Sequence, residues 1–128
     1  MNDPFGERLA GAVRQVGAPV AVGLDPHVER LPVRLRARFE GLSGAAWRAA
    51  AADAVQEFDA LAIEAMAGRV AAVKVQFAFY EQLGAPGFAA LEQTCRRVRE
   101  AGLLLIGDGK RGDIDSTARA YAAAGLHP

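Results

Sequence analysis

The stretch Leu103 to Tyr121, which reads LLLIGDGKRGDIDSTARAY, decides the fold. It begins with a short apolar run, residues 103–106, of the kind that forms a buried parallel strand. Asp108, Lys110 and Asp113 follow where the strand gives way to a loop. Their spacing, D-x-K-x-x-D, indicates a charge-compensated cluster in which acidic neighbours keep the lysine protonated. A lysine held in this way can donate a proton to a carbanion.

Two further apolar segments precede this strand. Residues 19–25 (PVAVGLD) and 70–76 (VAAVKVQ) are short and bounded by turn residues, so each predicts a strand. Apolar spacing and capping residues predict the helices, which are residues 4–16 with Asp3 as N-cap, 44–67 with Ser43 as N-cap, 86–101, and a fourth from an N-cap at Ser116-Thr117. Alternating strands and helices predict an α/β fold with a parallel sheet and right-handed crossovers.

Side-chain spacing also predicts what the helices bury. In the helix over 86–101, Phe88, Leu91, Cys95 and Val98 share one face, which we expect to pack on the core. Cys95 is then a small core side chain rather than a nucleophile.

Lys74 lies near the end of the second predicted strand, where an unpaired charge is costly. It therefore either extends its ammonium group to solvent or pairs with nearby carboxylates. A Schiff base with a carbonyl substrate is a further alternative, but acidic neighbours that hold the amine protonated argue against it.

Composition excludes several classes of partner. The 128 residues carry 15 basic and 15 acidic side chains, so no net charge attracts nucleic acid or an anionic membrane. No apolar run approaches the roughly 18 residues that a membrane span needs. The first residues, MNDPFGERLAG, lack the pattern of a signal peptide. A single cysteine suits a reducing compartment, and we expect a cytoplasmic protein.

The D-x-K-x-x-D motif resembles that of the orotidine 5'-phosphate decarboxylase superfamily. The longer string DGKRGDIDSTARAYA (108–122), together with VGLDP (22–26) and VAAVKVQFAFYEQLG (70–84), resembles the decarboxylase family itself, in its longer bacterial subgroup. The resemblance implies the N-terminal portion of a (β/α)8 TIM barrel, with about three βα units preceded by an N-terminal helix. Such barrels take about 250 residues and at least about 200. We therefore expect residues 1–128 to be the N-terminal part of a single barrel domain, without its C-terminal half.

The resemblance also implies an activity, which is decarboxylation of orotidine 5'-monophosphate (OMP) to UMP and CO2 in pyrimidine biosynthesis, with no metal or organic cofactor. Asp108 would lie against the substrate carboxylate. Lys110 would stabilise and protonate the carbanion at C6, within an array that also includes Lys74 and Asp113.

Other residues matched to the family motifs would bind substrate or complete a neighbouring site. Asp25 would contact the ribose hydroxyls, and Thr117 would contact the ligand. Asp113 with Ile114 would reach into the partner's site across a homodimer interface. Phosphate-binding residues of the family follow later strands, so we expect this chain alone to turn over OMP poorly or not at all.

Two positions depart from the subgroup's usual pattern. Asp115 stands where glycine is common, which adds negative charge beside the site, and Gly109 stands where alanine is common. We expect Gly109 and Gly112 to let the backbone bend tightly around the charged residues.

The same residues allow three other interpretations. Gly107, Gly109 and Gly112 spell G-x-G-x-x-G, as in a dinucleotide loop, although Asp108 and Asp113 would repel a pyrophosphate. The carboxylates at 25, 108 and 113 could bind magnesium, as in a sugar-phosphate decarboxylase or synthase of the same superfamily. The motif could also be a surface ion-pair cluster, in an inactive remnant that acts as an interaction module.

Overall fold

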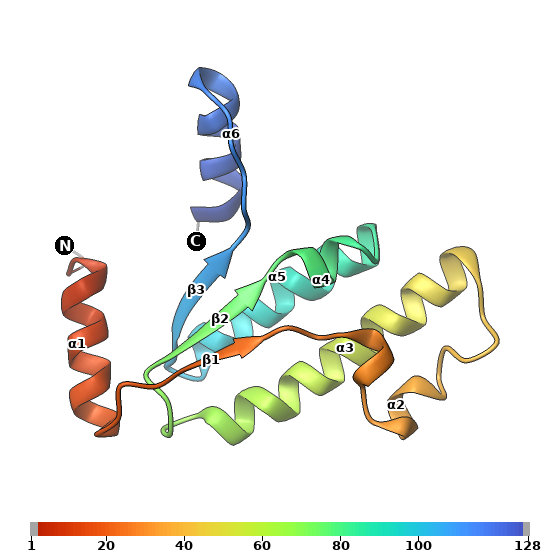
Figure 1. Ribbon diagram of the computed structural model, residues 1–128, viewed down its shortest axis with the longest axis horizontal. Helices are drawn as coiled ribbons and strands as arrows, with labels where there is room; N and C mark the ends of the chain where they lie inside the picture. Colours follow the sequence, from red (N-terminus) through yellow and green to blue (C-terminus); the bar gives the residue numbers. More distant parts are fainter. Residues whose placement is uncertain (1–2, 127–128) are drawn as a thin grey trace.

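Three parallel strands form the centre of the computed structural model, which describes residues 3–126 (Figure 1). They are β1 (Ala21–Leu24), β2 (Ala72–Gln76) and β3 (Leu104–Asp108), in the order β1-β2-β3. Pairing sets Gly23 beside Lys74 and Lys74 beside Ile106. Because all strands run the same way, their carboxyl ends meet at one edge of the sheet.

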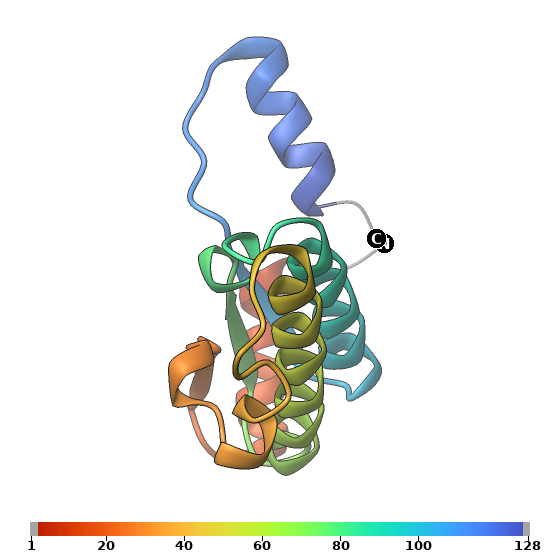
Figure 2. The same cartoon turned by 90° about the vertical axis from the view of Figure 1, so that its right-hand side faces the viewer.

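Helices connect the strands. They are α1 (Phe5–Val16), the 3-10 helix η1 (Val28–Arg30), α2 (Val33–Arg36), α3 (Gly44–Met66), α4 (Ala78–Glu81), α5 (Ala85–Glu100) and α6 (Asp115–Leu126). Figure 2 shows α3 and α5 running side by side. α1 lies at the end of the sheet where the strands begin, and α6 projects beyond the end where they finish (Figure 1). No helix within residues 3–126 is both long and apolar enough to cross a membrane.

The core lies between the sheet and the helices α3 and α5. Val73 and Val75 of β2 are fully buried there, as are Val55 of α3 and Val98 of α5. Side chains alternate between the two faces of β2, so Lys74 lies on the face opposite Val73 and Val75. Its partner in β1 is Gly23. The alternation therefore gives β2 one apolar face that packs on the helices and one face that carries Lys74.

The predicted order of three strands and four long helices is confirmed, but two N-caps are wrong. The first helix starts at Phe5, so Pro4 is the N-cap and Asp3 lies one residue too early. The last helix starts at Asp115, so Ser116 and Thr117 lie in its first turn. Ser43 does occupy the N-cap of α3, but its side chain makes no capping hydrogen bond.

The face that α5 buries also differs from the prediction. Leu91 and Val98 are buried and Cys95 is partly buried, but Phe88 is 52% exposed. Leu91 and Val98 share the buried face with three smaller residues, which are Gly87, Ala90 and Thr94. A Cβ on Gly87 would lie 1.9 Å from the carbonyl oxygen of Tyr80, so close packing against α4 turns Phe88 outward.

Candidate active site

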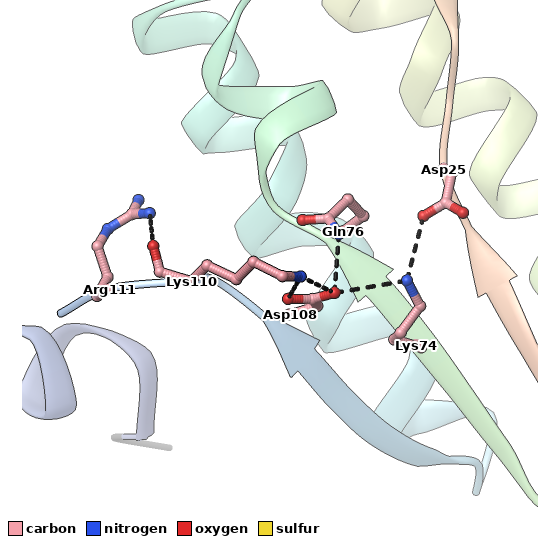
Figure 3. Close-up of polar contacts among 6 residues, drawn as sticks. All are labelled: Asp25, Lys74, Gln76, Asp108, Lys110 and Arg111. Atoms are coloured by element: carbon pink, nitrogen blue, oxygen red, sulfur yellow. Dashed lines mark hydrogen bonds and ion pairs between the residues drawn. The ribbon is translucent and has the colours of Figure 1, made fainter.

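Lys74 lies between two carboxylates at the carboxyl edge of the sheet (Figure 3). Its Nζ is 3.6 Å from Oδ1 of Asp25, which follows β1, and 3.6 Å from Oδ2 of Asp108, the last residue of β3. The parallel register brings these three side chains together from three strands. Of the two alternatives for Lys74, solvent exposure of its ammonium and pairing with carboxylates, the structure shows pairing.

Asp108 contacts Lys110 as well as Lys74. The Lys110 ammonium donates to both carboxylate oxygens of Asp108, at 2.5 and 2.7 Å. We call Asp25, Lys74, Asp108 and Lys110 the strand-end cluster. The hydrogen bond from Lys110 is the main cause that lowers the pKa of Asp108, against the opposing effect of burial. The Lys110 charge, a hydrogen bond from Gln76 and the Lys74 charge lower that pKa further.

Gln76 is a site residue that the sequence reasoning missed. Its Nε2 donates to Oδ2 of Asp108 at 2.8 Å, across the β2–β3 pair. A signal was present, because Gln76 lies two residues after Lys74 and so faces the same side of the strand. The amide fixes the carboxylate orientation without adding charge.

The strand-end cluster is open to solvent to different degrees. The exposed fraction of the side chain is 21% for Asp108, 37% for Lys74 and 79% for Lys110. Two ammonium groups therefore flank one ionised carboxylate, with Lys110 on the solvent side. An arrangement of this kind can bind an anionic substrate through the lysines and supply a proton from Lys110.

Asp113, Ile114 and Thr117 lie outside this cluster. Asp113 Oδ1 accepts a hydrogen bond from the backbone N–H of Ile114 at 2.8 Å, and no ion pair to it is found among residues 3–126. Ile114 is 76% exposed, and Thr117 is exposed in the first turn of α6. The array within one chain thus joins Lys74, Asp108 and Lys110, and a role of Asp113 in a partner's site stays a prediction.

Two of the three glycines in the G-x-G-x-x-G string, Gly107 and Gly109, have a packing role. None of the three has a positive φ, so the expected tight bend does not need their conformational freedom. A Cβ on Gly109 would lie 2.5 Å from the ring of Phe77, and one on Gly107 3.2 Å, whereas Gly112 has open space. Gly107 and Gly109 are small because Phe77 packs over them.

The geometry does not favour a divalent cation between the carboxylates. Lys74 places its ammonium between Asp25 and Asp108, where a shared metal ion would have to lie. Within the described part of the chain, no group of three or more histidine, cysteine or acidic side chains is arranged to hold a metal.

A buried polar cluster behind the sheet was also missed. Asp59 of α3 is fully buried, and its Oδ2 accepts hydrogen bonds from Tyr80 and Thr94, each at 2.7 Å. Burial raises the pKa of Asp59 to about 6, although both hydrogen bonds and the Arg97 charge oppose the rise. Burial and the neighbouring carboxylate also raise the pKa of the Tyr80 hydroxyl. This cluster fastens α4 to α3 and α5.

Barrels of the (β/α)8 class carry their functional side chains in this way, at the carboxyl ends of adjacent parallel strands that are each followed by a helix. A family model described as orotidine 5'-phosphate decarboxylase / HUMPS family matches residues 18–127. The chain belongs to this family, and its fold is the N-terminal portion of the (β/α)8 barrel. The expected family and fold class are both confirmed.

The relatives are named orotidine 5'-phosphate decarboxylase. The one from Corynebacterium efficiens is 43% identical over 128 residues, which are 100% of this chain and 41% of the relative. The one from Streptomyces coelicolor is 42% identical over 98% of this chain and 40% of the relative. The solved structure of Leishmania donovani OMP decarboxylase has a TM-score of 0.69 and 33% identity, over 95% of this chain and 39% of that one. The chain thus spans about two fifths of the length of these relatives.

Proposed function

We propose that the strand-end cluster serves the decarboxylation of OMP to UMP and CO2, as part of pyrimidine biosynthesis. The row Lys74–Asp108–Lys110 at the carboxyl edge of the sheet carries this proposal, because it combines a pair of cations with an ionised carboxylate. The names of the relatives support it. The reaction needs cations that stabilise a developing carbanion and a group that then protonates it.

The proposed chemistry takes place at C6 of the pyrimidine. The bond from C6 to the carboxylate carbon breaks, CO2 leaves, and the electron pair stays on C6. Lys110 stabilises this charge and transfers a proton from Nζ to C6, after which water reprotonates the amine. Asp108 lies beside the substrate carboxylate and holds Lys110 in place through the contacts at 2.5 and 2.7 Å. Lys74 holds Asp108 ionised from the other side.

Substrate binding involves both ends of the described fold. Asp25 contacts the ribose hydroxyls from the end of β1, and Thr117 contacts the ligand from α6. Asp113 and Ile114 act in the site of a second copy, in a homodimer. The high exposure of Ile114 and the projecting position of α6 support a contact with a partner there.

Residues 1–128 act in this proposal as the N-terminal part of one barrel domain. Binding of a remote phosphate lowers the barrier at the reacting carbon. The family's phosphate-binding loops follow later strands, so we expect the 128-residue chain alone to turn over OMP weakly or not at all. A cytoplasmic location fits a chain with a free cysteine.

The test is loss of OMP absorbance with four proteins: the 128-residue chain, a version joined to the C-terminal barrel half of a relative, and the Lys110→Ala variant of each. We expect turnover by the joined protein, at least about a thousandfold loss on Lys110→Ala, and no effect of EDTA. A joined protein that is folded but silent would refute the activity. Turnover that EDTA abolishes would favour a magnesium-dependent sugar-phosphate enzyme of the superfamily.

A further inference from the structure

We propose that Arg111 and Glu81 are positioning residues, which hold the backbone of Lys110 so that its ammonium stays at the site. The inference rests on the proposed function for the role of Lys110. It adds two residues that touch neither the substrate nor the reacting atoms. Their contacts link the loop after β3 to the short helix α4.

The side chain of Lys110 alone does not fix its position. It is 79% exposed and lies in a segment, residues 109–114, that belongs to no helix or strand. A long exposed lysine loses side-chain entropy when it is held in one geometry. Its contact with Asp108 therefore needs support from the backbone.

Arg111 supplies that support through its guanidinium group. Nη1 donates to the carbonyl oxygen of Lys110 at 3.1 Å, a contact drawn in Figure 3. Nη2 forms an ion pair with Oε1 of Glu81. The guanidinium carbon also lies 5.7 Å from the centre of the Tyr121 ring, so the same group reaches α6. The flat fork of an arginine can make these contacts at once, whereas a lysine cannot.

Glu81 is a firm anchor because α4 is fixed to the core. The neighbouring Tyr80 is fully buried and bonded to Asp59, and the backbone N–H of Phe77 donates to the carbonyl oxygen of Asp108 at 3.1 Å. The Glu81–Arg111 pair is also partly shielded, with side chains 25% and 36% exposed. The pair Glu92–Arg96 on α5, 76% and 57% exposed, is an ordinary surface pair and provides a matched control.

The first test measures the pKa of the Asp108 carboxylate by 13C NMR titration in the 128-residue chain. Lys110 is the main cause of the low pKa, so releasing Lys110 raises it. We expect Glu81→Ala and Arg111→Lys each to raise the pKa of Asp108, while Glu92→Ala leaves it unchanged. If the pKa of Asp108 were equal in the parent and in Glu81→Ala, the proposal would be overturned, even if the thermal stability of the variant fell.

The second test measures kcat and KM in the joined protein. Glu81→Ala should lower kcat about tenfold and change KM less than about twofold, because the lysine is misplaced while substrate binding persists. Arg111→Lys should behave in the same way, and Glu92→Ala like the parent. An unchanged kcat would overturn the positioning role. If the joined parent is itself silent, the proposed function fails, and the pKa of Asp108 still decides whether the pair positions Lys110.

Discussion

The buried carboxyl of Asp59 should make the stability of this protein depend on pH. Its pKa rises from the ordinary 3.8 to about 6 on folding, chiefly because burial disfavours the ionised form. Since one pKa unit corresponds to about 1.4 kcal/mol, ionised Asp59 costs the folded state roughly 3 kcal/mol at neutral pH. The folded-state pKa is the higher one, so the stabilising contribution is fully present below pH 3.8 and is lost as the pH rises through about 6.

Urea denaturation of the parent and of Asp59→Asn, at about pH 4 and about pH 7.5, measures this contribution. Asn cannot ionise, so its cost in the buried site is the same at both values. We expect the free energy of unfolding of the parent to fall by roughly 2.4 kcal/mol more between the two values than that of Asp59→Asn, because part of the contribution is already lost at about pH 4. Comparison of the two proteins cancels the contribution of other carboxyl groups to the pH dependence of stability. Asp108 is one of them, and its lowered pKa makes the folded state more stable as the pH rises.

Asp53, an exposed residue of the same helix, provides the control. Asp53→Asn should keep the pH dependence of the parent. Equal changes of the parent and Asp59→Asn with pH, or a larger gain of stability by the parent at the higher pH, would show that Asp59 does not have a raised pKa in the folded state.

Further predictions concern Gly109 and Asp115. Gly109→Ala should lower the free energy of unfolding by about 1–3 kcal/mol, because the new Cβ would press on the ring of Phe77, whereas Gly112→Ala, with open space around it, should change it little. Urea midpoints of the two variants test this, and equal midpoints would contradict it. Asp115 has a φ of 51°, in the left-handed region where glycine is preferred, so Asp115→Gly should be about 1 kcal/mol more stable than Asp115→Ala. An alanine variant as stable as the glycine one in thermal melts would speak against a left-handed residue at this position.

Much of the fold follows from the sequence because its strands are short apolar runs and its helices have regular spacing. Residues 70–76 and 103–106 predict strands whose centres are correct, although β2 starts at Ala72 and β3 extends to Asp108. Phe88 shows the limit of this reasoning. Apolar spacing counts large side chains, whereas the buried face of α5 also includes small ones that allow α4 to approach.

The candidate site was predictable where charge is expensive to bury. Lys74 lies within β2 and Asp108 ends β3, and pairing offsets the cost of placing these charges there. Gln76, Glu81 and Arg111 were not found, because their contacts cross between segments that lie far apart in sequence. Asp59 was hidden for a related reason, since its partners Tyr80 and Thr94 come from two other helices.

The glycines show how packing can change the meaning of a motif. Gly107 and Gly109 match a dinucleotide-binding string, yet the ring of Phe77 occupies the space beside them. The same ring explains in this chain why position 109 is glycine where the resemblance led us to expect alanine. Asp115, where the resemblance led us to expect glycine, has a backbone in the left-handed region that glycine favours.

Counting the products tests whether the strand-end cluster decarboxylates OMP, as proposed. The joined protein is given OMP labelled in its carboxylate, and UMP and labelled CO2 are both measured. We predict one UMP and one CO2 for each OMP consumed, with Lys110→Ala near the uncatalysed rate and Arg96→Ala, a distant exposed cation on α5, near the parent rate. A product other than UMP, or equal rates for the parent and Lys110→Ala, would show that the proposed decarboxylation is wrong.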